Sequence, residues 1–175
     1  MYLKIFMKKH FLRSYRFIFL FVAFPLLVNA QKSLDPVLKK YNKESIPYIK
    51  VLELSKIQDE VFVIDARERE EYETSHLKNA IYVGYEDFKI DNAREHIPKN
   101  KKVVVYCSLG VRSEDIAEKL KKEGYSEVYN LYGGIFEWIN NDLPVYDKNE
   151  NKTKKVHAFS KEWGIYLKKG IKVYE

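Results

Sequence analysis

The chain has 175 residues, a formal net charge of +6 and one cysteine, which excludes a disulfide within the chain. Its first 30 residues hold five basic side chains and no acidic ones, so their removal would leave a net charge near +1. A nucleic-acid partner is therefore not expected, because such binding needs a strongly basic face on the folded domain.

Residues 1–30 have the pattern of a secretory signal peptide. A basic lead precedes an uncharged apolar run from Phe17 to Val28, and small residues stand at Val28 and Ala30, the two positions that a signal peptidase reads. A transmembrane anchor is the alternative, but a helix from Phe17 to Ala30 would span about 21 Å of a hydrocarbon core of about 30 Å. We therefore expect cleavage and export, most simply to a periplasm, with no stable membrane insertion afterwards.

Residues 31–45 form a helical lead to the domain. A short helix is expected over 33–41, with Ser33 as its cap and Asp35 and Pro36 in its first turn. Pro47 then marks the start of the domain proper, which we place at residues 46–146.

Within residues 46–146, strand patterns alternate with helix patterns. The sequence predicts strands at 48–52, 61–65, 80–83, 102–106 and 127–131, and helices or helical turns at 53–57, 67–77, 86–96, 113–123 and 135–140. The segments 61–65 and 102–106 are apolar on both faces, which is typical of buried strands in a parallel sheet. The alternation indicates an α/β fold whose parallel sheet is covered by helices on both faces.

Residues 147–175 form a basic C-terminal extension. The segment has eight lysines and four acidic residues, and it shows no strand pattern. Its apolar residues, among them Phe159, Trp163 and Leu167, indicate that it packs onto its own domain. Contact with a membrane or a protein partner is the alternative.

Cys107 stands where an α/β fold places its ligands. It comes directly after the carboxyl end of the predicted strand 102–106, and a four-residue loop leads from it to Arg112 and the next helix. Backbone amides at a helix N-terminus and the Arg112 charge favour a thiolate, and Gly110 allows a tight turn. These features favour a nucleophile over a buried structural cysteine. Glu114 and Asp115 in the first turn would oppose a thiolate unless they point away from it.

Five segments in this order resemble the single-domain rhodaneses, which are sulfurtransferases: VFVIDAREREEY, HLKNAIYV, VVVYCSLGVRS, GYSEVYNLYGGIFEW and LPVY. The resemblance covers residues 46–146. It implies a rhodanese-like parallel sheet and a persulfide carried on Cys107. It also implies a structural role for Asp65 and Arg67, and a substrate-binding role for the loop residues Ser108, Leu109, Gly110, Val111 and Arg112.

The length of the loop distinguishes sulfur transfer from phosphatase chemistry. Related dual-specificity phosphatases have five residues between cysteine and arginine, whereas this chain has four. A shorter loop encloses a smaller ring of N–H donors, which suits one sulfur atom better than a tetrahedral phosphate. The segment HLKNA departs from the family by lacking a glycine and a proline after the histidine, and residues beyond Tyr146 lie outside the pattern.

The sequence therefore predicts an exported, monomeric sulfurtransferase. It would move sulfane sulfur from a small donor anion such as thiosulfate to a thiol or cyanide-type acceptor, and it would need no cofactor. No metal site is expected, because His76, His96 and His157 are scattered without a second ligand at metal spacing. The alternative is a non-catalytic module that carries sulfur or binds a partner through residues 147–175.

Overall fold

The computed structural model describes residues 33–174, so the predicted signal peptide lies outside the described residues. The described residues belong to one compact unit. None of the helices between residues 33 and 174 combines the length and the apolar character that a bilayer crossing needs.

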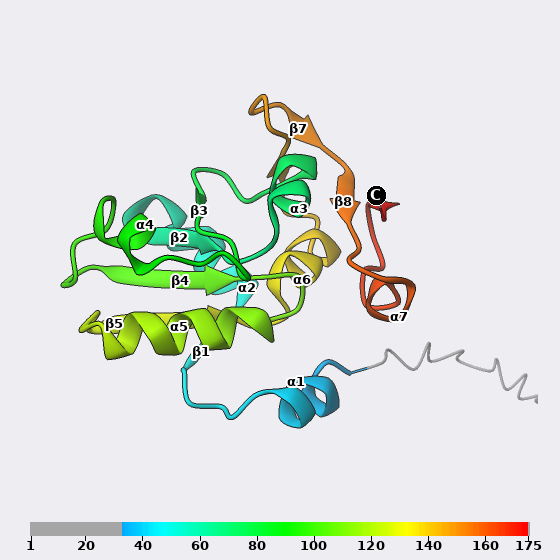
Figure 1. Ribbon diagram of the computed structural model, residues 1–175. Helices are drawn as coiled ribbons and strands as arrows, with labels where there is room; N and C mark the ends of the chain where they lie inside the picture. Colours follow the sequence, from blue (N-terminus) through cyan, green and yellow to red (C-terminus); the bar gives the residue numbers. More distant parts are fainter. Residues whose placement is uncertain (1–32, 175) are drawn as a thin grey trace, which may run out of the picture. The chain divides into compact units, whose positions relative to one another are not determined.

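A five-stranded parallel sheet forms the centre of the domain (Figure 1). Its strand order is β1 (Tyr48–Ile49), β5 (Glu127–Leu131), β4 (Lys102–Tyr106), β2 (Phe62–Asp65) and β3 (Ile81–Tyr82). The middle strand β4 is paired on both sides, so that Val105 lies opposite Ile64 of β2 and Asn130 of β5. The predicted α/β fold with a parallel sheet is confirmed.

Alternate residues of β4 supply the two cores of the domain. Val104 and Tyr106 face one cluster, whereas Val103 and Val105 face the other. Buried residues of α2 (Val51–Ile57) and α6 (Gly134–Asn140) belong to the first cluster. Those of α4 (Ile90–Arg94) and α5 (Arg112–Lys122) belong to the second, and Figure 1 shows α5 running along the sheet. Helices therefore cover both faces, as predicted.

Several predicted elements differ locally from the structure. The predicted helices 67–77 and 86–96 are shorter in the structure, as α3 (Arg69–Thr74) and α4 (Ile90–Arg94). The predicted strand 48–52 ends at Ile49, because α2 already begins at Val51. Val51 and Leu54 are one helical turn apart and are both buried, which is the spacing of a helix and not of a strand. A 3₁₀ turn η1 (Gln58–Glu60) follows α2. The first helix, α1 (Asp35–Tyr41), has Leu34 rather than Ser33 as its N-cap. The Ser33 hydroxyl nevertheless accepts the N–H of Asp35 at 3.2 Å.

Short strands that the sequence did not predict lie at the end of the domain and in the C-terminal extension. β6 (Val145–Tyr146) pairs antiparallel with β7 (Lys152–Thr153), and β8 (Lys155–His157) pairs parallel with β9 (Ile171–Val173). A single helical turn, α7 (Lys161–Gly164), lies between β8 and β9. The expectation of no strands was wrong because strands of two or three residues are too short to show periodicity.

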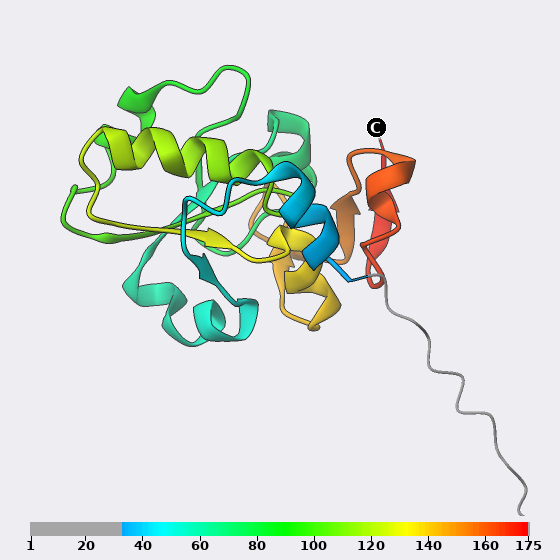
Figure 2. The ribbon, with the colours of Figure 1, turned by 90° about the horizontal axis from the view of Figure 1, so that it is seen from below.

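The extension packs against α6 of its own domain, as its apolar residues indicated. Val156, Ala158 and Leu167 are buried in the same cluster as Trp138 of α6. Asn140 ties the two parts together by donating to the Tyr166 carbonyl at 2.9 Å and accepting from the Lys168 amide at 2.8 Å. Both ribbon views show the orange-to-red segment beside α6 (Figures 1 and 2).

Candidate active site

Cys107 follows directly after the central strand β4, in the position that the sequence predicted. Its sulfur accepts a hydrogen bond from the Gly110 amide at 3.1 Å, and the Ser113 hydroxyl lies 3.5 Å away. Ser113 has one hydroxyl proton and makes a shorter contact, 2.7 Å, to the side-chain oxygen of Asn130. The Gly110 amide is therefore the stronger donor to the sulfur.

Two asparagines hold the loop at Gly110. The Gly110 carbonyl accepts from the side-chain amides of Asn42, at 2.7 Å, and Asn130, at 2.8 Å. Gly110 has a φ of 107°, and a Cβ there would lie 3.2 Å from the Leu131 carbonyl oxygen. Glycine thus fits a conformation that other residues rarely adopt, and this conformation directs its N–H at the sulfur. Neither asparagine was singled out from the sequence.

The positive charge of Arg112 is already paired with a carboxylate. Its guanidinium forms a two-pronged ion pair with the Glu71 carboxylate at 2.7 and 2.8 Å. Its second nitrogen also donates to the Ser108 hydroxyl at 3.1 Å, and that hydroxyl donates to Glu71 at 2.9 Å. The positive charge that the sequence assigned to substrate capture is therefore balanced by a carboxylate within the same network.

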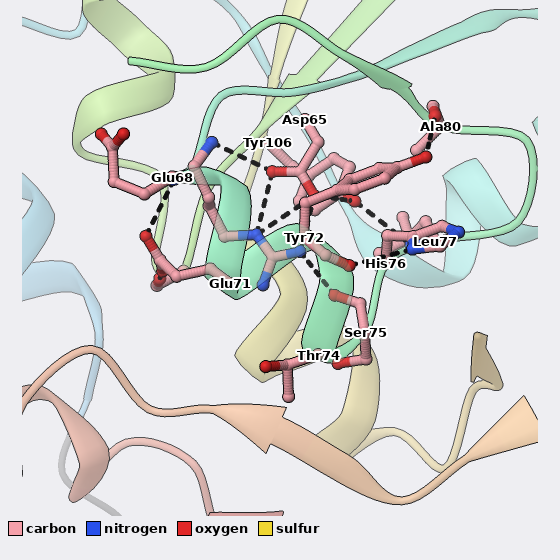
Figure 3. Close-up of polar contacts among 12 residues, drawn as sticks. Asp65, Glu68, Glu71, Tyr72, Thr74, Ser75, His76, Leu77, Ala80 and Tyr106 are labelled. Carbon is pink, nitrogen blue, oxygen red and sulfur yellow. Dashed lines mark hydrogen bonds and ion pairs between the residues drawn. The ribbon is translucent and has the colours of Figure 1, made fainter. Parts of the chain in front are cut away.

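Glu71 belongs to the first turn of α3 (Arg69–Thr74) and is nearly inaccessible, with 3% of its side chain exposed. Burial raises the pKa of Glu71, but the hydrogen bonds and charge of Arg112, with help from Arg67, outweigh burial and lower it to about 2. Glu71 also accepts the Glu68 amide in a capping box, which Figure 3 shows. Glu71 was not singled out from the sequence, because the usual capping box begins with Ser or Thr rather than Glu.

Asp65 and Arg67 form a fully buried ion pair beside the end of β4. Arg67 donates to Asp65 at 2.9 Å and to the Ser75 carbonyl at 2.6 Å. Tyr106 donates its hydroxyl to Asp65 at 2.5 Å and accepts the Leu77 amide at 3.1 Å (Figure 3). These bonds join the segment after α3 to the strand that carries Cys107.

Glu114 and Asp115 bind groups other than the thiol, so the opposition to a thiolate that their position raised is not realised. Glu114 accepts the backbone amides of Lys43 and Ser45 at 2.9 and 3.0 Å, which ties the helical lead to α5. Asp115 accepts the Tyr85 hydroxyl at 2.8 Å.

A pocket of about 170 Å³ adjoins Cys107, and we call it the Cys107 pocket. Its remaining walls come from the loop and from two aromatic residues of the extension: Ser108, Leu109, Val111, Arg112, Phe159 and Trp163. Phe159 and Trp163 were assigned a packing role from the sequence, and nothing in their spacing indicated this site. A larger hollow of about 480 Å³, between the end of α6 and β7, is lined by other residues and contains no thiol.

The geometry suits nucleophilic chemistry at a single sulfur atom. Only 2% of Cys107 is exposed, yet the residue lines a pocket and its sulfur contacts a directed N–H donor. Among residues 33–174, no three His, Cys, Asp or Glu side chains gather closely enough to hold a metal ion.

Sequence comparison relates the chain to known proteins. The profile of the Rhodanese-like domain family matches residues 50–141. The thiosulfate sulfurtransferase GlpE of Coxiella burnetii is 33% identical over 108 residues, which cover 62% of this chain and 97% of the relative. A tRNA uridine(34) hydroxylase of Aster yellows witches'-broom phytoplasma is 40% identical over 85 residues, but the match covers only 28% of that protein.

Solved structures share the fold at low sequence identity. The thiosulfate sulfurtransferase from Pseudomonas aeruginosa is 20% identical and has a TM-score of 0.56, over 77% of this chain and 25% of that chain. The rhodanese-like domain of the Alr3790 protein from Anabaena is 22% identical with a TM-score of 0.54, over 58% of this chain and 79% of that domain. These likenesses bear on the arrangement of the sheet and its helices.

Proposed function

The chain belongs to the family of rhodanese-like domains, and we propose that it is an exported sulfurtransferase that carries sulfane sulfur on Cys107. The observation that carries the proposal is the placement of the thiol, which meets the Gly110 amide at 3.1 Å and lines a pocket of about 170 Å³. Thiosulfate is the proposed donor, because GlpE of Coxiella burnetii is named for that activity and the match covers 97% of its length.

In the loading half-reaction, the Cys107 thiolate attacks the outer sulfur of thiosulfate. A new S–S bond forms to Cys107, the S–S bond of thiosulfate breaks, and sulfite leaves with the bonding electron pair. The Gly110 amide faces the sulfur and stabilises negative charge there. The thiolate supplies the electron pair of the new S–S bond and sulfite takes the pair of the broken one, so no oxidant or reductant is needed.

In the transfer half-reaction, an acceptor nucleophile attacks the outer sulfur of the persulfide. Cyanide takes that sulfur to form thiocyanate, or a thiolate takes it to form a new persulfide. The Cys107–sulfur bond breaks, and its electron pair stays on the Cys107 sulfur as a thiolate. The Gly110 amide then stabilises the leaving thiolate, so one donor serves both halves of the cycle.

We assign Arg112 a positioning role in this cycle. Its guanidinium is bound to Glu71 and to the Ser108 hydroxyl, so it links both sides of the loop to α3. This role differs from the direct capture of the donor anion that the sequence suggested.

The test uses the single thiol of the chain. After incubation with thiosulfate, intact-protein mass spectrometry should show one added sulfur atom, which cyanide then removes as thiocyanate. Cys107→Ser should show neither the added sulfur nor thiocyanate formation above the uncatalysed rate. Wild-type turnover by this variant would refute the assignment.

The same measurements separate an enzyme from a sulfur carrier. An enzyme should form thiocyanate over many cycles, at a rate that saturates with thiosulfate. A protein that loads one sulfur and releases it only once would instead be the non-catalytic carrier module.

A further inference from the structure

The C-terminal extension places an aromatic wall beside Cys107. Phe159 and Trp163 line the Cys107 pocket, although the extension follows the matched family segment, which ends at residue 141. Trp163 is held by an edge-to-face contact with Tyr41 of α1, at 5.5 Å between ring centroids, and packs against the main hydrophobic cluster. The extension is therefore part of the reaction site as well as of the core.

Phe159 has a backbone conformation that bulky residues rarely adopt. Its φ is 63°, in the left-handed region, and its N–H donates to the His157 ring at 3.2 Å. The residue remains 46% exposed, so burial in the core does not explain the strain. Strained backbone of this kind is often found at ligand-binding sites.

Arg112 is the one charged side chain among the residues that line the Cys107 pocket, and its charge is balanced. The Arg112 guanidinium is paired with Glu71, and its central carbon lies 4.7 Å from the centroid of the Phe159 ring. Phe159 therefore shields a cation that is already balanced, and Leu109, Val111 and Trp163 supply further apolar surface. The pocket therefore offers mainly apolar surface to the group that an acceptor carries beside its thiol.

From these observations we propose that Phe159 and Trp163 make the Cys107 persulfide selective for acceptor thiols that carry an apolar group of about the size of one aromatic ring. The inference rests on the proposed function of Cys107 and specifies its acceptor as an apolar thiol. Apolar cavities of about 150 Å³ can bind benzene, and the Cys107 pocket has about 170 Å³.

The transfer step is the one already described, with the acceptor defined. The apolar thiolate attacks the outer sulfur of the Cys107 persulfide, the new persulfide forms on the acceptor, and the bonding electron pair returns to the Cys107 sulfur. While the step occurs, the apolar group of the acceptor lies in the pocket that Phe159 and Trp163 line, where it is removed from water.

The experiment compares two acceptors of similar thiol acidity. Protein loaded with thiosulfate is mixed with phenylmethanethiol or with 2-mercaptoethanol, and loss of the added sulfur is followed by mass spectrometry. The second-order rate constant should be about tenfold higher for phenylmethanethiol, as expected for the burial of one ring. Phe159→Ala should bring the ratio of the two rate constants close to one.

Ile165→Ala is the matched control, because Ile165 lies in the same extension, is 47% exposed and does not line the pocket. This variant should keep the wild-type ratio. A wild-type ratio near one, or an equal fall in Ile165→Ala, would overturn the proposal.

A second measurement tests the pocket without persulfide chemistry. Cys107 is the only thiol, so its alkylation by N-benzyl iodoacetamide and by iodoacetamide reports on the pocket directly. The benzyl reagent should be favoured about tenfold in wild type and not in Phe159→Ala. A benzyl preference in a protein that cannot be loaded would refute the proposed function alone, whereas loading without either preference would refute the aromatic selectivity alone.

Discussion

The buried ion pair of Glu71 and Arg112 gives a quantitative prediction for the free energy of unfolding of the domain. Glu71→Gln keeps the size of the side chain but removes the charge that balances Arg112. The pKa of Glu71 is lowered from 4.5 to about 2, and this difference corresponds to about 3 kcal/mol of stability at neutral pH. Loss of one partner of a buried ion pair costs about 3–5 kcal/mol in other proteins, which is of the same order.

The pH dependence of this loss follows from the direction of the shift. Because the folded-state pKa is the lower one, the unfolded chain takes up a proton first as the pH falls. The contribution of Glu71 is therefore complete above about pH 5 and disappears as the pH falls to about 2. The difference in unfolding free energy between wild type and Glu71→Gln should shrink over the same range.

Urea unfolding at constant ionic strength, from pH 7 to about pH 2.5, measures this difference. Glu70→Gln is the control, since Glu70 is an exposed carboxyl in the same first turn of α3, and it should change stability by less than about 0.5 kcal/mol. If Glu71→Gln were as stable as the control at pH 7, or if its deficit did not depend on pH, the charge balance assigned to Glu71 would be wrong.

Two further predictions concern the loop and the N-terminus. At Gly134, φ is 54° and a Cβ would lie 2.2 Å from the Cys107 carbonyl oxygen, so Gly134→Ala should cost about 3 kcal/mol and slow persulfide loading. Thermal unfolding and mass spectrometry check this, and an unchanged melting temperature would contradict it. Secretion by a bacterial host should yield a mature protein that starts at Gln31, and N-terminal sequencing that finds residues 1–30 retained would rule out the proposed cleavage.

The periodic parts of the domain could be predicted from the sequence with accurate bounds. The strands 102–106 and 127–131 match the structure residue for residue, because buried strands impose an apolar pattern that their neighbours lack. The same pattern placed Cys107 at the carboxyl end of the central strand. The short strands of the extension leave no such pattern, and the sequence reading missed them.

The sequence by itself determined the parallel α/β fold, the position of the single thiol and the length of its loop. All of these depend on the local order of residues along the chain. Only the tertiary structure decided that Glu71 neutralises Arg112 and that the Phe159 ring packs against the Arg112 guanidinium. These partners are 41 and 47 positions from Arg112, and contacts over such separations arise from the packing of whole elements, which no local pattern of charge or hydropathy records.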